Sequence, residues 1–358
     1  MRYHAIMVTL DQDKLQVLLQ QMVGDMGAAA VAPLVVLGDR LGLYRALATH
    51  GPLMPDELAD RTATTERYVR EWCLAQAGSG YIDYDAATGR FGMSPEQQAV
   101  FADADSPACM TGGYYAIAAL SIDEPRISHI FKTGEGLSWG EHCNCLFCGT
   151  EKFFRPGYKA NLISEWLPAL DGVVEKLQAG GKVADVGCGH GASTLVMAEA
   201  FPRSEFIGFD FHEASIDCAN QRAQEAGLQN VRFEVATAKH YPGNDYDLIA
   251  FFDCLHDMGD PVGAAAHTRK ALKPDGTMLL VEPFAHDAVE DNLNPVGRMH
   301  YAFSTMVCTP ASISQEVGLA LGAQAGPKRL ERVVREGGFS RFRVATQTPF
   351  NLIMEVTA

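Results

Sequence analysis

Residues 183–191 read Val-Ala-Asp-Val-Gly-Cys-Gly-His-Gly, and this run decides the fold. Apolar residues suited to a buried strand lead into glycines at alternate positions, Gly187, Gly189 and Gly191, and a helix-like stretch begins at Ala192. Glycines at such a turn let the backbone bend tightly and let a ligand lie directly against the main chain. A strand, a glycine loop and a helix in this order predict the first unit of a nucleotide-binding sheet.

An acidic residue follows at the distance that such a site requires. Asp210 lies nineteen residues beyond Gly191, at the end of the strand-like run 205–209. A carboxylate at the tip of the next strand can accept hydrogen bonds from both hydroxyls of a ribose. The sequence therefore predicts a pocket for a nucleoside-containing cofactor, with Asp210 and the adjacent Phe211 at the ribose.

Two kinds of cofactor compete for this loop. Gly187-x-Gly189-x-x-Ala192 also satisfies the loose dinucleotide fingerprint, in which alanine can replace the third glycine. Asp185 argues against a dinucleotide, because a carboxylate beside two phosphates is repelled by them. The same carboxylate suits a cofactor that carries an ammonium group and a sulfonium.

Strands and helices alternate from Lys182 onward, which predicts an α/β fold with a doubly wound, Rossmann-like sheet of seven strands and ligands at the carboxyl ends of the strands. The strand candidates are 183–186, 205–209, 231–235, 248–252, 277–281, 341–346 and 351–356. Only residues 347–350 separate the last two, so these must pair as an antiparallel hairpin. We expect a plain turn at Lys273-Pro-Asp-Gly, ahead of the fifth strand.

The acidic-x-Gly-x-Gly-x-Gly motif from Asp185 and the C-terminal hairpin resemble the class I S-adenosylmethionine (SAM) dependent methyltransferases. That resemblance implies SAM as the cofactor, and a purely parallel dinucleotide domain would lack the hairpin. After the third strand, many relatives place an aspartate where Thr237 stands, and threonine can still accept a hydrogen bond from the adenine through its hydroxyl. The expected cofactor-binding residues are Asp185, Gly187, Gly189, Gly191, Asp210, Phe211, Thr237, Ala238 and Asp253.

The segment after the fourth strand, Leu255-His256-Asp257-Met258, resembles the Leu-His-Asp-Trp segment of small-molecule O-methyltransferases. In that family the histidine is the general base, so the resemblance implies that role for His256. A neutral imidazole can take the proton of an attacking hydroxyl. The alternative is that His256 caps a helix or packs in the core. We do not assign Asp257 as its partner, because adjacent side chains need not face the same way.

Aromatic and polar residues outside these motifs are candidates for the wall of the acceptor pocket. The expected wall residues are Phe154, Tyr158, Glu282, His300 and Tyr301. Phe154 and Tyr158 are expected to pack a lid over the cofactor rather than to stack on nucleic acid. Glu282 could instead assist the base or be a surface acid, and His300 and Tyr301 have an alternative as core residues. A separate cluster, His142, Cys143, Cys145 and Cys148, could hold a soft metal or receive a thiophilic substrate, or could simply fill a lid. We assign no metal.

The first hundred residues read as a mostly helical winged-helix domain. Apolar residues at helical spacing predict helices over 15–26 and 31–48, and 81–84 with 90–93 predict a small hairpin as the wing. Residues 1–100 hold 8 basic and 12 acidic side chains, and a helix in the major groove normally presents a basic face. In the O-methyltransferases that this chain resembles, such a domain builds a homodimer, so we expect dimerisation rather than DNA binding.

Composition limits the remaining possibilities. The chain has 358 residues and a formal net charge of −15, which disfavours nucleic acid as a partner. Nine scattered cysteines favour a reducing cytoplasm, and the longest apolar stretch, 27–38, is too short to span a membrane. We expect a winged-helix domain over 1–105, linking helices and a substrate lid over 106–180, with one long helix over 157–177, and a SAM-binding domain over 181–358.

These features favour a cytoplasmic methyltransferase that uses SAM to methylate a small molecule, most readily at a hydroxyl. One alternative is a winged-helix transcriptional regulator with a SAM-sensing domain. An NAD-linked oxidoreductase is disfavoured by Asp185 and by the terminal hairpin. The identity of the acceptor cannot be derived from the sequence, because pocket specificity depends on how side chains face.

Overall fold

The computed structural model describes residues 10–358, and the chain divides into two compact units, Met1–Tyr114 and Tyr115–Ala358. Each unit has its own apolar core, so each is described by itself. The second unit contains most of the segment 106–180 that we expected as linking helices and lid, together with the whole of the expected cofactor domain.

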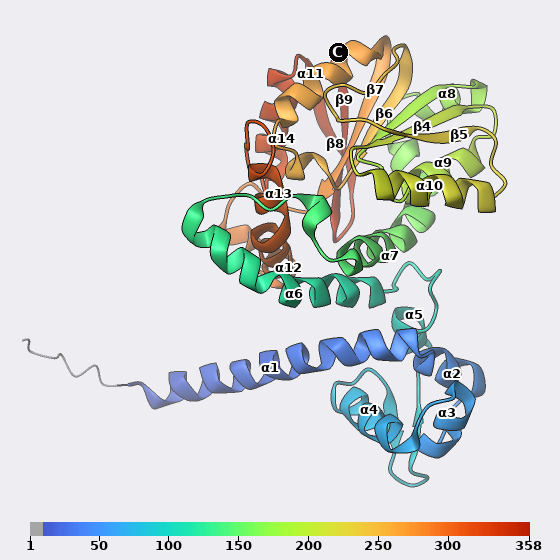
Figure 1. The fold of residues 1–358 in the computed structure, drawn as a ribbon, viewed down its shortest axis with the longest axis vertical. Helices are drawn as coiled ribbons and strands as arrows, with labels where there is room; N and C mark the ends of the chain where they lie inside the picture. The colour runs from blue at the N-terminus through green and yellow to red at the C-terminus, as the bar shows by residue number, and fades with distance from the viewer. Residues whose placement is uncertain (1–9) are drawn as a thin grey trace, which may run out of the picture. The chain divides into compact units, whose positions relative to one another are not determined.

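The first unit is helical with one small hairpin (Figure 1), which confirms the mostly α winged-helix region expected from the sequence. Its core packs Val35, Tyr44, Leu47, Leu58 and Trp72, all at most 5% exposed. Its elements are α1 (Gln12–Arg40), α2 (Leu43–His50), α3 (Pro55–Thr62), α4 (Glu66–Gly78), β1 (Asp83–Asp85), β2 (Arg90–Gly92) and α5 (Pro95–Phe101).

Helix α1 differs from the expectation of two helices over 15–26 and 31–48. It runs unbroken through residues 27–30, where the break was expected, and through Pro33. The chain turns instead at Gly42, inside the segment expected as the second helix, and the φ of +74° there is a left-handed conformation that favours glycine. By length and composition alone, α1 is apolar enough to cross a membrane, with a mean hydropathy of 1.4 over 18 residues. The apolar character of α1 thus extends beyond the stretch 27–38, which by itself is too short to span a membrane.

The second unit begins with helices and continues as alternating strands and helices. Before the sheet come α6 (Thr111–Thr133), the 3₁₀ turn η1 (Trp139–Glu141), α7 (Asn144–Asn161), the π turn η2 (Leu162–Trp166), η3 (Leu167–Ala169) and α8 (Val173–Ala179). We expected one helix over 157–177; instead the backbone loosens into a π turn and then breaks at Gly172, which has a φ of +68°.

The sheet has seven strands in the order β5-β4-β3-β6-β7-β9-β8. Its strands are β3 (Lys182–Val186), β4 (Glu205–Asp210), β5 (Val231–Val235), β6 (Tyr246–Phe252), β7 (Leu272–Pro283), β8 (Arg341–Gln347) and β9 (Asn351–Thr357). The strands β5, β4, β3, β6 and β7 are parallel, whereas β9 pairs antiparallel with both β7 and β8. The doubly wound sheet with its C-terminal antiparallel hairpin is thus confirmed.

One difference concerns the turn expected at residues 273–276. The structure places it inside β7, where the pairing with β6 shifts between Leu272 and Thr277. The extra residues are accommodated as an irregularity in the ladder, because the partner strand supplies fewer residues over the same span.

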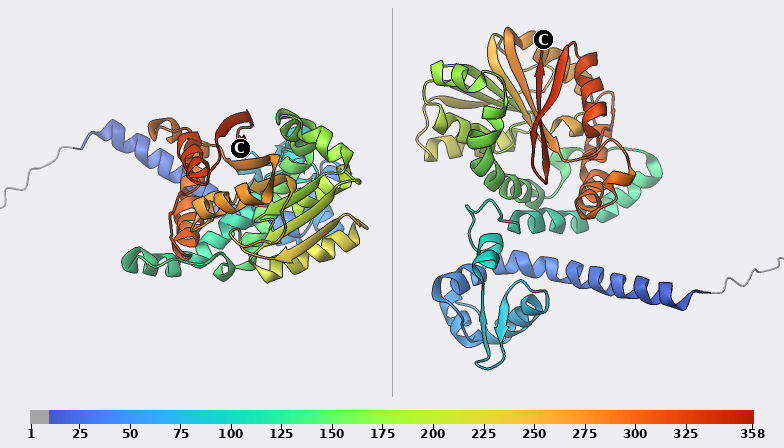
Figure 2. Two further views of the ribbon diagram at one scale, coloured as in Figure 1. Left: turned by 90° about the horizontal axis from the view of Figure 1, so that it is seen from above. Right: turned by 180° about the vertical axis from the view of Figure 1, so that it is seen from behind.

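Helices cover both faces of the sheet (Figures 1 and 2). Alternate strand residues face opposite ways: Phe206 and Leu248 join the cluster that includes Leu177 of α8, while Ile207 and Ile249 join the cluster that includes Leu330. The remaining elements are α9 (Ala192–Ala200), α10 (Glu213–Glu225), η4 (Leu255–Asp257), α11 (Pro261–Ala271), η5 (Glu290–Asn292), α12 (Pro295–Phe303), η6 (Ser304–Cys308), α13 (Thr309–Ile313) and α14 (Gly326–Glu336).

Candidate active site

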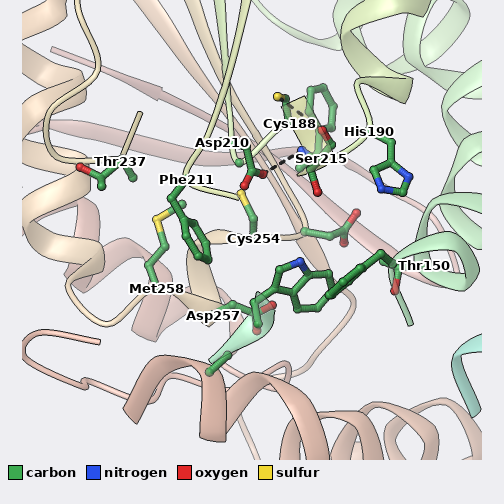
Figure 3. Close-up of a pocket in the computed structure, with 18 of the residues that line it drawn as sticks. Thr150, Cys188, His190, Asp210, Phe211, Ser215, Thr237, Cys254, Asp257 and Met258 are labelled. Carbon is green, nitrogen blue, oxygen red and sulfur yellow. Dashed lines mark hydrogen bonds between the residues drawn. The ribbon is translucent and has the colours of Figure 1, made fainter. Parts of the chain in front are cut away.

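A pocket of about 490 Å³ opens at the carboxyl ends of β3, β4 and β6 (Figure 3). Strand order reverses between β3 and β6, because the chain goes from β3 outward to β4 on one side and later returns to β6 on the other. Ligands of open α/β sheets bind at this kind of switch point. All the residues that line the pocket belong to the second unit.

The glycine loop after β3 forms the floor of the pocket. Gly187 has a φ of +77°, and a Cβ there would lie 2.7 Å from Cys254 Sγ, so the position has no room for a side chain. The amides of Gly187 and Cys188 donate to the carbonyl of Phe209, which ties the loop to β4. Gly187 and Gly189 line the pocket, as predicted, whereas Gly191 lies behind it as the residue before α9.

Asp185, at the end of β3, is fully buried beneath this loop and does not line the pocket. Its Oδ2 accepts hydrogen bonds from Ser193 Oγ (2.7 Å) and Thr194 Oγ1 (2.6 Å), and its Oδ1 has no partner among the described residues. Burial outweighs these bonds and raises the pKa of Asp185 to about 6. A cation in the pocket above would favour the charged carboxylate.

Asp210, at the end of β4, lines the pocket with Phe211 (Figure 3). Its two oxygens accept hydrogen bonds from the amides of Gly189 and His212, both at 2.9 Å, which fix the carboxylate in place. Each oxygen keeps a second lone pair for a ligand hydroxyl. Burial nevertheless raises the pKa of Asp210 above its ordinary value.

Thr237 and Ala238, in the segment after β5, also line the pocket, as expected from the sequence. The hydroxyl of Thr237 lies 3.1 Å from Nδ1 of His240. A hydroxyl that donates to that nitrogen keeps its own lone pairs for an adenine amine.

Asp253 follows β6 with a φ of +51° and faces the pocket. Its carboxyl accepts hydrogen bonds from the hydroxyl of Tyr158 (3.0 Å) and the side-chain amide of Asn351 (2.7 Å). Burial, and then the nearby charge of Glu282, raises the pKa of Asp253 to about 8. Tyr158 and Phe154 of α7 stack with ring centroids 6.0 Å apart, and both line the pocket as predicted.

His256 lies just behind the pocket wall, in the turn η4. It is 4% exposed and does not line the pocket, but its neighbour Asp257 does, with Oδ1 3.0 Å from His256 Nε2. Nδ1 of His256 hydrogen-bonds to Oε2 of Glu282, whose Oε1 accepts the amide of Leu255 at 2.9 Å. Burial alone would lower the pKa of His256, but the two carboxylates outweigh it and hold that pKa well above its usual range.

This geometry answers two questions that the sequence left open. Asp257, which we left out because adjacent side chains can diverge, faces the same side as His256, since the tight 3₁₀ turn swings the two together. Glu282, expected either in the acceptor wall or beside the base, is 1% exposed and contacts the imidazole, which agrees with the second alternative.

Two further residues expected in the acceptor wall do not line this pocket. His300 is buried beside Gln324, with Nδ1 3.2 Å from that amide nitrogen, and burial lowers the pKa of His300 to about 4. Tyr301, on the same helix α12, does not line the pocket either. The pocket therefore supports the alternative, in which His300 and Tyr301 are structural residues.

Several residues that sequence reasoning missed complete the pocket. They come from η1, α7, the glycine loop, η4 and the segment around α13, and the principal ones are Trp139, Phe147, His190, Asp257, Met258 and Gln315. His190 and Thr150 lie across the pocket from Met258 and Thr237 in Figure 3. His190 stands inside the glycine motif, so its position was a usable signal; the others are brought in by helices whose facing the sequence leaves open.

The cysteine segment at the start of α7 is built differently from the metal cluster that we considered. Cys143 and Cys145 form a disulfide, and Cys148 is free and exposed. His142 Nδ1 lies 2.6 Å from a carboxylate oxygen of Asp123. Among the described residues, no metal-ligand cluster includes these cysteines.

Comparison with known proteins finds a family match in each unit. Residues 177–338 match the model of a methyltransferase domain, and residues 29–102 match that of an Rv2258c-like winged helix-turn-helix domain. An uncharacterized methyltransferase of Bacillus subtilis, YcgJ, is 30% identical over 122 residues, which are 33% of this chain. The match takes in 47% of that relative, so the chain spans about half its length.

Solved structures share the fold over nearly the whole chain. Mitomycin 7-O-methyltransferase aligns with a TM-score of 0.66 at 16% identity, covering 97% of this chain and 100% of that one. Human N-acetylserotonin methyltransferase in complex with SAM aligns with a TM-score of 0.64 at 17% identity, covering 98% and 99%. At such identities the likeness shows the fold alone: a helical N-terminal region followed along the chain by a Rossmann-like domain.

Proposed function

We propose that this protein is an enzyme that transfers the methyl group of SAM to a hydroxyl of a small molecule, since residues 177–338 match the model of a methyltransferase domain and residues 29–102 match that of a winged helix-turn-helix domain. The observation that carries the proposal is the pocket at the switch point of the sheet. There, Asp210 is held by the amide of Gly189 with lone pairs left for a ribose, and acidic Asp185 lies beneath the floor.

The acceptor would enter beside an aromatic and apolar wall that includes Trp139, Phe147 and Met258. The charged groups that line the pocket are mostly acidic, and Lys239 is already paired with Asp260 and Glu316. A neutral hydroxylated ring fits such a wall better than an anion, because a phosphate or carboxylate would meet carboxylates without a free cation.

Binding measurements on the full chain test the cofactor. Isothermal titration should show SAM and its demethylated product binding at about micromolar dissociation constants, and NADH not binding. Titration of Asp210→Asn should show weaker binding of both SAM and its product, because that variant loses the charged ribose acceptor. Binding of NADH in place of SAM would contradict the proposal.

We propose that the proton of the acceptor leaves through the pair His256 and Asp257. Two carboxylates, Asp257 and Glu282, flank one imidazole, and the raised pKa of His256 keeps that imidazole protonated. The imidazolium and its two carboxylates carry one net negative charge, so Asp257 can accept the proton that leaves the acceptor. Asp257 is the member that lines the pocket, and His256 behind it orients the carboxylate and spreads the charge. Methyl transfer is an in-line displacement, and it needs the oxygen to lose its proton as the bond to carbon forms.

The pair is tested by turnover with an acceptor found by screening a library with labelled SAM. His256→Ala should lower kcat by roughly two to four orders of magnitude, and Asp257→Asn by about tenfold or more, with SAM affinity kept in both. Glu316→Gln is the matched control, because its carboxylate also lines the pocket but pairs with Lys239. Unchanged turnover in His256→Ala would mean that positioning alone drives the reaction.

The second candidate function is regulation of transcription by a SAM-sensing winged helix. The helix α4, which would be the second of the helix-turn-helix, pairs its Arg67 with Glu71 and its Arg70 with Glu66, so neither arginine presents an unopposed charge. Gel shifts at low salt, with and without SAM, separate the two functions, and retardation of DNA would support the regulator.

We also propose that the protein is a homodimer through its N-terminal domain. An apolar stripe, Leu19, Met22, Val23 and Met26, follows one face of α1 at helical spacing, and each residue is at least 47% exposed. A stripe of this kind on a long helix is stabilised when a second copy covers it.

A further inference from the structure

We propose that His256, Asp257 and Cys308 form a binding site for a borderline divalent cation such as Zn²⁺, and that the bound ion inhibits methyl transfer. The binding of the ion stands by itself, whereas the inhibition rests on the proposed role of His256. The site lies behind the wall of the cofactor pocket, and two elements build it, η4 and η6, which are nearly fifty residues apart in sequence.

The distances fit one small ion. A nitrogen of His256, a carboxylate oxygen of Asp257 and Sγ of Cys308 all lie within 4.8 Å of one another, and Nε2 is 3.0 Å from Oδ1. In a tetrahedral zinc site, bonds of about 2.0 to 2.3 Å separate the ligand atoms by roughly 3.3 to 3.8 Å. Small side-chain adjustments would therefore bring the three atoms around a cation.

The contacts of His256 determine which of its two ring nitrogens would bind the ion. Nδ1 is held by Glu282, which is 1% exposed and is itself fixed by the amide of Leu255. A carboxylate on one imidazole nitrogen leaves the other for the metal and makes it a better ligand. Asp257 Oδ1 is buried and, apart from that imidazole nitrogen, has no partner among the described residues.

The donor set selects the class of ion. Imidazole nitrogen, carboxylate oxygen and thiolate sulfur together suit Zn²⁺ or Co²⁺, whereas Mg²⁺ and Ca²⁺ prefer oxygen ligands only. Binding replaces the imidazole proton and the thiol proton, so a dication enters as two protons leave for solvent and the charge of the cluster is unchanged. Since Asp257 and Ala311 line the pocket, the remaining coordination position would open on that side.

The ion would block the reaction without blocking the cofactor. It would occupy Nε2 of His256 and an oxygen of Asp257, the two groups through which the acceptor's proton is proposed to leave. The cofactor-facing groups, Asp210 and the glycine loop, are not part of the cluster. Inhibition by the ion should therefore lower kcat and leave the dissociation constant of SAM unchanged.

Titration of the full chain with Co²⁺, in a buffer with a non-thiol reductant, tests the binding. We expect one equivalent to produce the visible bands of tetrahedral cobalt and a thiolate-to-cobalt charge-transfer band, and Zn²⁺ to abolish both. Cys308→Ser should lose the charge-transfer band and need at least about tenfold more Zn²⁺ for half-inhibition, relative to its own metal-free rate. The double variant Cys143→Ser/Cys145→Ser is the matched control and should behave as the parent does.

The outcomes separate this proposal from the proposed function. A charge-transfer band that persists in Cys308→Ser, or no band in the parent, overturns the metal site, while methyl transfer measured with a chelator still tests the enzyme. If Cys308→Ser no longer binds SAM, and so has not folded, Asp257→Asn replaces it as the test variant. The Asp257 side chain is 23% exposed, so this substitution disturbs the packing of the core less. It should keep the charge-transfer band but weaken Co²⁺ binding at least about tenfold; unchanged affinity would overturn the site.

Discussion

A single buried carboxylate, Asp185, lies under the glycine loop, where its charge would act on a cationic cofactor in the pocket. From the sequence it was expected to meet the cation directly. In the structure it lies under the loop, where the hydroxyls of Ser193 and Thr194 hold one oxygen and the other is unpartnered. Its influence on the pocket is therefore electrostatic, and a charge in the interior acts over several ångströms because screening there is weak.

This placement predicts how SAM binding depends on pH. The pKa of Asp185 in the ligand-free protein is about 6, and a bound cation would lower it, because the charged carboxylate is then stabilised. SAM affinity should be full above pH 6 and should fall as pH drops below 6, by at most about tenfold per pH unit, since binding must then release a proton. Isothermal titration between pH 5 and pH 8 measures this.

The variant Asp185→Asn is the test of that assignment. It should bind SAM more weakly at pH 8 and lose the pH dependence, because no group at this position then titrates. A variant that keeps the parent's profile would place the dependence on another group, of which Asp210 is the nearest candidate, since burial raises its pKa as well.

At the residue scale, sequence reasoning found the groups that follow strands directly and missed those that depend on a turn. Asp210, Phe211, Thr237 and Asp253 all line the pocket as predicted, since a strand end fixes their position. The partnership of His256 with its neighbours could not be predicted, because it depends on the dihedral angles of one 3₁₀ turn and on a glutamate twenty-six residues away.

At the scale of elements, short apolar runs and the glycine loop predicted the sheet well, whereas the continuity of helices was predicted poorly. The hairpin of β8 and β9 and the strand before the loop agree with the structure to within a residue. Helix ends were predicted poorly: α1 continues through residues 27–30, where a break was expected, and through Pro33, and the helix expected over 157–177 divides into a π turn and α8. Tertiary packing decides such cases, because an interior proline removes one hydrogen bond and neighbouring contacts can offset that loss.

The glycine loop predicts two different costs for the same substitution. A Cβ on Gly191, whose φ is +78°, would lie 2.6 Å from the ring of Phe233 and 3.1 Å from Ala219. Gly189, with a φ of +52°, has nothing within 4 Å of such a Cβ and lines the pocket. Gly191→Ala should destabilise the second unit by about 1 to 3 kcal/mol or more. Gly189→Ala should destabilise it less.

Calorimetry and titration together check this pair. Gly191→Ala should lower the Tm of the second unit by roughly 2 to 4 °C per kcal/mol. In Gly189→Ala the larger effect should be on SAM affinity, because its methyl group would lie where the cofactor approaches the backbone. Equal losses of Tm in the two variants would contradict the packing around Phe233.

At the scale of the whole molecule, the acidic surface and the apolar helix α1 act in opposite directions. A net charge of −15 keeps copies of the chain apart through long-range repulsion, which salt screens. The stripe of Leu19, Met22, Val23 and Met26 favours contact, because covering it removes apolar surface from water. If a dimer forms, salt should weaken the repulsion between its two copies and leave the apolar contact in place. The stability of the dimer should therefore rise with ionic strength.

The last prediction concerns that dimer. Light scattering at moderate salt should give twice the 38.8 kDa of one chain, and Leu19→Glu/Val23→Glu should give one chain, because two buried charges in each copy would face an apolar partner. Gln20→Glu/Gln21→Glu adds the same charge on exposed positions of α1 and should remain dimeric. Since α1 is also long and apolar enough for a membrane, lipid vesicles form the second arm. A monomeric parent that sediments with vesicles would assign the stripe to lipid, whereas a dimer that ignores them would assign it to a second copy.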